Sequence, residues 1–221
     1  MDVACGTGVV ALTASRQGIE VEGIDLTPEL INRANENSKI MGLKAKFVEG
    51  DAEFLPYKES EFDIILSQYG HMFAPRPSIV VKELARVLKP GGILAFSTWP
   101  KELFMGKFFK LIESFSQPLP PEVASPVLWG DMAVIEDRLK DHFNEIEFAR
   151  DTMFAPTMSP AHMLKLFEKN AGPLANLVKA LANDPIKLSN LRNAVLELIE
   201  KFFSNNFLRQ DFLMTKCIKK A

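Results

Sequence analysis

The sequence predicts an α/β fold with a mostly parallel sheet, and three observations lead to that prediction. Short apolar runs alternate with helical patterns over residues 1–98. The segment Gly6-Thr7-Gly8 lies between the first apolar run and the first helical pattern. An aspartate ends or follows each of the first three runs, at Asp2, Asp25 and Asp51. Strands that alternate with helices form βαβ units, whose strands run parallel.

The first part of the chain is expected to contain five strands and three helices. The strands are predicted over residues 1–4, 21–24, 45–48, 62–67 and 93–98, and the helices over residues 8–17, 28–41 and 78–88. The second helix has a start signal, because Thr27 can cap it and Pro28 suits the first helical position. One face of this helix, expected to lie on the sheet, consists of Leu30, Ile31, Ala34, Ser38 and Met41. The run Lys89-Pro90-Gly91-Gly92 is expected to end the third helix and lead into the fifth strand.

The pattern changes after residue 100. Helices are predicted over residues 102–116 and 131–141, strands over 144–152 and 212–219, and helix throughout 159–204, with a proline-rich connector over 118–126. Two late strands separated by a mostly helical segment indicate one sheet edge that carries an insertion. We therefore expect a single domain over residues 1–221 with a helical insertion, or lid, over about 153–206.

Composition narrows the class of protein. The chain has 221 residues, of which 47% are hydrophobic and 24% charged, and its formal net charge is -2. This balance is typical of a globular protein and disfavours nucleic acid or an anionic membrane as partner. Cys5 and Cys217 lie at opposite ends of the chain, and no zinc-binding pattern occurs. We expect reduced thiols, no metal, no signal peptide and a cytoplasmic location.

The three aspartates indicate the kind of ligand. The carboxyl ends of parallel strands meet at one edge of a sheet, where ligands bind. Asp25 suits the ribose hydroxyls of an adenosine, and Asp51 can accept a hydrogen bond from an adenine amino group. Asp2 would oppose a diphosphate, because like charges at ~4 Å repel by about 4 kcal/mol at an effective dielectric of 20. S-adenosylmethionine instead carries an ammonium and a sulfonium, which Asp2 would attract.

On these residues the chain resembles the class I S-adenosylmethionine-dependent methyltransferases, in the small-molecule branch that includes ubiquinone- and menaquinone-biosynthesis enzymes. The motifs that carry the resemblance are Asp2-Val3-Ala4-Cys5-Gly6-Thr7-Gly8, Gly23-Ile24-Asp25, Gly50-Asp51-Ala52, the segment 62–68 and the segment 83–92. The resemblance implies a doubly wound, Rossmann-like sheet of seven strands with an antiparallel last strand. It also implies a methyl transfer from S-adenosylmethionine to a small molecule.

The resemblance further implies which residues bind the cofactor. Asp2, Gly6 and Gly8 would hold the methionine part, Asp25 the ribose, and Asp51 with Ala52 the adenine. Ala4, Leu26 and Gln68 complete the expected cofactor-binding set.

Two departures from the family pattern bear on these expectations. Ala4 stands where the family often has glycine. Met1 stands one residue before Asp2, whereas family members have a full first strand and helices before this point. We therefore expect a truncated chain that binds the cofactor weakly or not at all.

The sequence indicates less about the methyl acceptor than about the cofactor. His71, in the loop after the fourth predicted strand, is the candidate general base, although a histidine that only packs is the favoured interpretation. A hydrophobic or aromatic acceptor is suggested by an apolar stripe of Met105, Phe108, Phe109 and Phe115, which is also typical of plain core. Two alternative functions stay open. The Gly6–Ala11 pattern also fits a nicotinamide-dependent oxidoreductase, and the chain also fits a non-catalytic binding protein that keeps the methyltransferase-like fold. A homodimer is expected as a partner arrangement.

Overall fold

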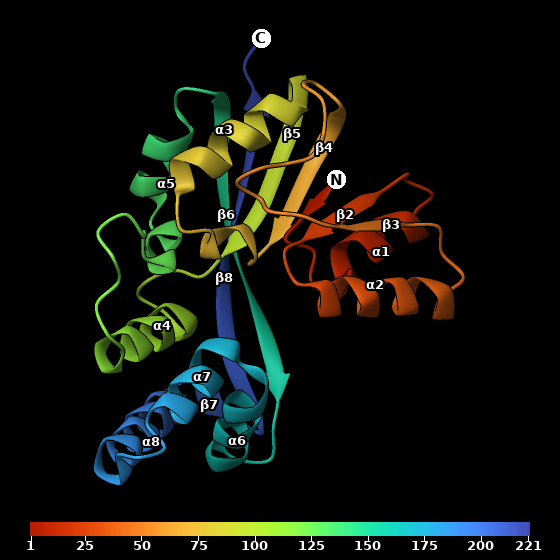
Figure 1. Ribbon diagram of the computed structural model, residues 1–221. Coiled ribbons are helices and arrows are strands. Elements are labelled where there is room, and N and C mark those ends of the chain that lie inside the picture. The colour runs from red at the N-terminus through yellow and green to blue at the C-terminus, as the bar shows by residue number, and fades with distance from the viewer. The chain divides into compact units, whose positions relative to one another are not determined.

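The computed structural model describes residues 1–221, which form two compact units (Figure 1). The sheet unit consists of Met1–Thr98, Pro121–Ala149 and Leu213–Ala221. The helical unit consists of Trp99–Pro120 and Arg150–Phe212.

The sheet unit has the expected α/β architecture. Its strands are β1 (Asp2–Val3), β2 (Glu22–Asp25), β3 (Lys46–Glu49), β4 (Phe62–Gln68), β5 (Leu88–Thr98) and the parts of β6 (Phe143–Pro156) and β8 (Phe207–Lys219) that belong to this unit. Its helices are α1 (Val9–Arg16), α2 (Pro28–Ile40), η1 (His71–Phe73), α3 (Pro77–Val87), η2 (Pro126–Gly130) and α5 (Met132–Leu139). The strand order is β3-β2-β1-β4-β5-β8-β6, in which β1 to β5 pair in parallel and β8 is antiparallel to β5. The prediction of a doubly wound sheet with an antiparallel last strand is confirmed.

Strand β1 is shorter than the predicted strand over residues 1–4. It pairs with β2 on one side, where Asp2 aligns with Gly23, and with β4 on the other, where Asp2 aligns with Leu66. The strand ends at Val3 because Ala4 has a φ of 53°, which is incompatible with extended backbone. The chain therefore turns away from the sheet one residue earlier than its apolar pattern suggests.

Helices α1 and α2 lie beside β2 and β3 (Figure 1) and enclose a hydrophobic cluster. Its buried members are Cys5, Ala11, Leu12, Val21, Ile31, Ala34 and Phe47. The predicted inner face of α2 is correct at the buried residues Ile31, Ala34 and Ser38 but wrong at Met41, which lies past the end of the helix and is exposed. Thr27 precedes α2 as expected, yet its side chain makes no capping hydrogen bond.

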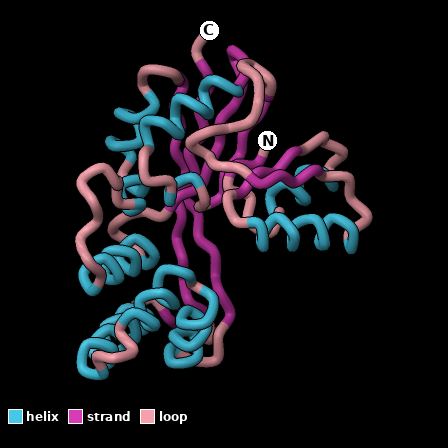
Figure 2. The backbone as a smooth tube through the Cα atoms, in the orientation of Figure 1, coloured by secondary structure: helices cyan, strands magenta, loops and turns pink.

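Three strands, β5, β6 and β8, are several residues longer than predicted. Strand β5 begins at Leu88, before the glycine pair, because Leu88 pairs with Phe62 and a bulge follows. Strands β6 and β8, two long strands in Figure 2, each extend beyond the predicted residues into the part of the chain that forms the helical unit. In that unit β8 pairs in antiparallel fashion with the short strand β7 (Phe203–Ser204). The two-residue strand β7 raises the total to eight strands, one more than expected.

The helical unit contains α4 (Phe104–Phe115), α6 (Pro160–Asn170), α7 (Gly172–Ala180) and α8 (Pro185–Glu200). The segment predicted as continuous helix over 159–204 thus contains three helices and the whole of β7, and a proline occupies the first turn of each helix. An aromatic cluster of Phe104, Phe108, Phe167 and Phe202, with ring centroids 5.1–6.1 Å apart, forms the core of this unit. None of the helices is both long and apolar enough to span a bilayer.

Candidate active site

The turn between β1 and α1 is built on three left-handed residues. Ala4, Gly6 and Gly8 have φ angles of 53°, 54° and 84°. The Gly8 N–H donates to the Cys5 carbonyl oxygen at 2.9 Å, and the Cys5 N–H donates to the Ile24 carbonyl oxygen at 3.0 Å. The turn is therefore closed on itself and anchored to β2, at the carboxyl edge of the sheet.

The two glycines of this turn have different surroundings. A Cβ atom at Gly8 would lie 2.7 Å from the Phe47 ring and 3.2 Å from the Ala34 Cβ, so Gly8 is required for packing. A Cβ atom at Gly6 would meet nothing within 4 Å. The backbone of Gly6 thus faces open space, into which a ligand can approach closely.

Ala4 occupies a backbone conformation that costs an alanine about 1–2 kcal/mol. We expect Ala4→Gly to raise the free energy of unfolding by about 1 kcal/mol, since the greater freedom of glycine in the unfolded chain offsets part of the gain. Urea unfolding measures this change. The control is Ala14→Gly, within α1, where the same substitution is expected to cost about 1 kcal/mol. A loss of stability in both variants would contradict the prediction.

Asp2 is buried at the base of the turn, with 1% of its surface exposed. Its Oδ2 accepts a hydrogen bond from the Ala11 N–H at 3.0 Å. Burial raises the pKa of this carboxyl to about 7, and the nearby Asp25 adds to the rise. At neutral pH Asp2 is therefore only partly ionised, and a cation placed beside it would favour the charged form.

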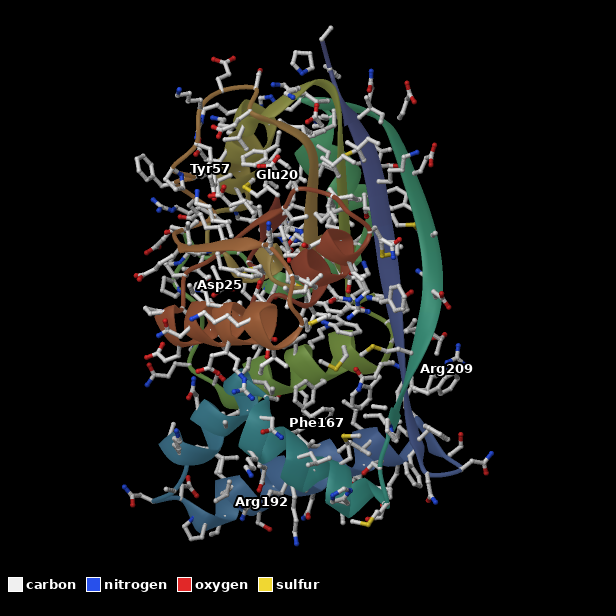
Figure 3. The ribbon with its side chains drawn as sticks, turned by 90° about the vertical axis from the view of Figure 1, so that its right-hand side faces the viewer. Glu20, Asp25, Tyr57, Phe167, Arg192 and Arg209 are labelled. Carbon is white, nitrogen blue, oxygen red and sulfur yellow. The ribbon has the colours of Figure 1, made fainter.

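Asp25 lies at the end of β2, next to the start of α2 (Figure 3). Its Oδ2 accepts a hydrogen bond from the Gly6 N–H at 2.8 Å, and its Oδ1 accepts one from the Thr27 N–H at 2.9 Å. One carboxylate thus ties the glycine turn to the entry of α2. A carboxylate has about four lone-pair positions, so two further donors can still bind.

The remaining predicted cofactor residues lie at the same sheet edge. The Gly50 N–H donates to the Asp25 carbonyl oxygen at 2.9 Å, which brings the segment containing Asp51 against the end of β2. Asp51 and Ala52 are partly exposed, and the Asp51 Oδ1 accepts from the Glu53 N–H at 2.9 Å. Leu26 is 65% exposed, and Gln68 is exposed at the end of β4.

These residues fit the cofactor that the resemblance implies. The backbone above Gly6 is open, and Leu26 presents an apolar side chain that the protein does not cover. The nearby carboxylates of Asp2 and Asp25 match a cationic ligand better than a diphosphate.

His71 lies in η1, directly after β4, and is 1% exposed. Its ring packs edge-on against Phe96 and Trp129, with centroids 4.6 and 4.7 Å away. Burial and the nearby Arg138 lower the pKa of His71 to about 3, so the ring is neutral at physiological pH. A buried ring with so low a pKa is a poor proton acceptor. The geometry therefore argues against His71 as the general base, and that role stays a prediction.

Two further residues beside the turn, Ser67 and Gly70, were not among the predicted site residues. Ser67 is buried near the end of β4, and its hydroxyl donates to the Val3 carbonyl oxygen at 2.7 Å. Gly70 follows β4 and lies so close to Ala4 that a Cβ atom there would be 2.4 Å from the Ala4 Cβ. In the sequence, only the presence of a polar residue, Ser67, within the apolar run of β4 could have indicated its contact with Val3.

The chain is similar to a known protein family and to several known proteins. The family described as "Methyltransferase domain" matches residues 1–96. An uncharacterized protein of Mycobacterium tuberculosis is 32% identical over 215 residues, which cover 97% of this chain and 78% of that protein. The 2-methyl-6-phytyl-1,4-hydroquinone methyltransferase of Synechocystis is 36% identical over 100 residues, or 45% of this chain and 31% of that enzyme.

Solved structures show the same fold. The YcgJ protein of Bacillus subtilis matches with a TM-score of 0.60 and 21% identity, covering 100% of this chain and 91% of that one. A phosphoethanolamine N-methyltransferase of Haemonchus contortus, solved with S-adenosylhomocysteine, matches with a TM-score of 0.61 and 17% identity, covering 100% of this chain and 48% of that one.

Proposed function

Because the chain belongs to the class I S-adenosylmethionine-dependent methyltransferases, we propose that the carboxyl edge of β1 to β3 is its cofactor site. The protein transfers a methyl group from S-adenosylmethionine to a small-molecule acceptor. When bound, the cofactor supplies an electrophilic methyl group on its sulfonium.

In this proposal Asp25 accepts hydrogen bonds from the ribose hydroxyls while it holds the turn through the Gly6 N–H. Asp51 and Ala52 lie against the adenine. The open backbone at Gly6 admits the methionine part, with Gly8 and Ala4 shaping the turn and Asp2 balancing the positive charge. Leu26 and Gln68 line the rest of the cofactor site. The observation that carries the proposal is the open space above Gly6, next to a carboxylate that already orders the turn.

We further propose a hydrophobic or aromatic acceptor. The support is the acceptor named for the Synechocystis relative, a phytyl hydroquinone. Phe108 and Phe109 are buried in the core of the helical unit and therefore do not themselves offer a contact surface. This part of the proposal includes a role for α6 to α8 as a lid.

Calorimetry with S-adenosylhomocysteine tests the cofactor site. We expect Asp25→Asn to weaken binding at least about tenfold, since hydrogen bonds that involve a charged group contribute about 1.5–3 kcal/mol each. The matched control is Asp63→Asn, because Asp63 is exposed and pairs only with Lys89 at 2.7 Å. Equal affinity of both variants would place the ribose elsewhere, and thermal unfolding checks that Asp25→Asn remains folded.

The same titration separates the alternatives. Binding of NADH in place of S-adenosylhomocysteine would indicate an oxidoreductase. Binding of S-adenosylhomocysteine without release of this product in any acceptor screen would indicate a binding protein. An apolar quinol is the first acceptor to test, by transfer of a labelled methyl group.

We also propose a cellular location, the absence of a nucleic-acid partner and an oligomeric state for this protein. The buried free thiols of Cys5 and Cys217 support a reducing, cytoplasmic location. The net charge of -2 supports a protein without a nucleic-acid partner. The long edge strand β6 supports a homodimer, which sedimentation would test.

A further inference from the structure

Ser67 joins two segments of the sheet unit that lie far apart in the sequence. Its hydroxyl donates to the carbonyl oxygen of Val3, the last residue of β1, at 2.7 Å. The same oxygen contacts the His71 backbone N–H at 3.3 Å and the His71 ring Nδ1 at 3.0 Å. One buried side chain therefore connects the start of the glycine turn to η1.

The protons in this network can be assigned. A serine hydroxyl has one proton, and here it points to the Val3 carbonyl, which is only an acceptor. Ser67 must therefore accept both contacts from His71, so the Nδ1 atom carries a proton. Because the ring is buried and neutral, its Nε2 is unprotonated, and Nε2 has no hydrogen-bond partner.

A second contact links the same two segments. A Cβ atom at Gly70 would lie 2.4 Å from the Ala4 Cβ and 2.6 Å from the Ala4 carbonyl oxygen. The loop after β4 thus rests directly on the turn, at a distance that only glycine permits.

Aromatic packing also holds the His71 ring. The rings of Phe96 and Trp129 contact it edge-on, and the Arg138 guanidinium lies over the Trp129 ring at 4.5 Å. The ring cannot turn without opening this aromatic packing, so its Nδ1–H keeps pointing at Ser67.

We propose that Ser67 and His71 are positioning residues of the methyl transfer. They hold the loop after β4 in register with the glycine turn, so that the segment on the acceptor side and the segment on the cofactor side move as one body. His71 acts in this way through its Nδ1–H and not as a base. The inference rests on the proposed cofactor site, because the turn must contact the cofactor for its position to matter.

The test compares Ser67→Ala with Ser38→Ala in the full chain. Ser38 is a matched control because it is also buried, in α2, and its hydroxyl also donates to a backbone carbonyl, that of Leu43 at 2.8 Å. We expect Ser67→Ala to weaken S-adenosylhomocysteine binding about fivefold to tenfold, the size of one lost buried hydrogen bond. Ser38→Ala should lower the unfolding temperature similarly and leave the affinity unchanged.

Hydrogen exchange supplies a readout that does not need the ligand. In unliganded Ser67→Ala, the amides of residues 4–8 and 69–73 should exchange faster together, whereas Ser38→Ala should change neither segment. Nitrogen NMR of the His71 ring should show the Nδ1-protonated tautomer in the parent chain and a loss of that preference in Ser67→Ala.

Substitutions at His71 test the donor itself. His71→Asn keeps an N–H close to the position of Nδ1 and should retain most of the affinity and exchange protection. His71→Leu fills the space without a donor and should behave like Ser67→Ala. Equal behaviour of these two variants would overturn the proposal, as would unchanged exchange in folded Ser67→Ala.

The outcomes distinguish this inference from the proposed function. If the parent chain fails to bind S-adenosylhomocysteine, the proposed cofactor site does not function in this chain, and the exchange and tautomer measurements still decide whether Ser67 couples the two segments. If the parent chain binds and Ser67→Ala binds equally well, the cofactor site stands and the positioning role falls.

Discussion

Replacing Gly8 by alanine is expected to cost about 3 kcal/mol in the free energy of unfolding. The left-handed backbone at this residue costs an alanine about 1–2 kcal/mol. Its Cβ would also lie 2.7 Å from the Phe47 ring, within the hydrophobic cluster, and overpacking of this kind costs about 1–3 kcal/mol. Urea unfolding of Gly8→Ala against the parent chain measures the sum.

Gly6→Ala is the matched control for this experiment. Gly6 has the same kind of backbone conformation, but no atom lies within 4 Å of its Cβ position, so only the backbone cost of about 1–2 kcal/mol applies. Adding Phe47→Leu should relieve the clash in Gly8→Ala and give a favourable coupling energy of about 1 kcal/mol. Equal losses at the two glycines would refute the close-packing explanation.

The second large effect concerns Asp2 and the pH dependence of stability. The pKa of Asp2 is raised to about 7 in the folded chain, against 3.8 for its ordinary value, so folding favours the protonated form. The stabilisation is therefore complete below about pH 4 and is lost as the pH rises towards 7, by about 1.4 kcal/mol per pH unit. Between pH 5 and pH 8 the loss is roughly 3 kcal/mol.

Asp2→Asn removes this dependence, because an amide stays neutral while its oxygen can still accept from the Ala11 N–H. We expect the variant to be more stable than the parent chain at pH 8 by a wider margin than at pH 5. Urea unfolding at pH 5 and pH 8 measures the difference in the free energy of unfolding between the variant and the parent chain. Contributions from groups other than Asp2 cancel in this difference. Asp63→Asn is the control, since Lys89 lowers the pKa of that exposed carboxyl, and it should leave the slope between pH 5 and 8 unchanged. A parallel pH dependence in Asp2→Asn and the parent chain would contradict the prediction.

Ligand binding should show the opposite trend at this residue. The ammonium of S-adenosylhomocysteine favours ionised Asp2, so affinity should rise from pH 6 to pH 8 in the parent chain. In Asp2→Asn the affinity should be lower at pH 8 and nearly independent of pH over this range. The stabilising substitution is thus expected to be the one that harms binding.

Local sequence patterns were sufficient to predict the order of strands and helices in the sheet unit. Alternating apolar runs placed β2, β3 and β4 to within a residue, and Pro28 marked the start of α2. These features depend on hydrophobic periodicity and on backbone preferences, both of which are properties of neighbouring residues. The parallel order then follows from the βαβ connections, and with it the common edge of Asp2, Asp25 and Asp51.

The details of the site depended on contacts between distant residues. The contact of Ser67 with Val3 spans 64 residues, and nothing in the local sequence of β4 indicates which carbonyl the hydroxyl reaches. His71 looked like a candidate base because its type allows that role, whereas its burial is set by Phe96 of β5 and by Trp129 of η2, which is far away in the sequence. Likewise, Gly6 and Gly8 are indistinguishable as letters, and only the position of Phe47 separates the open glycine from the packed one. Strand and helix order follows from local physics, while pKa values, close packing and hydrogen-bond partners depend on which distant atoms folding brings within a few ångströms.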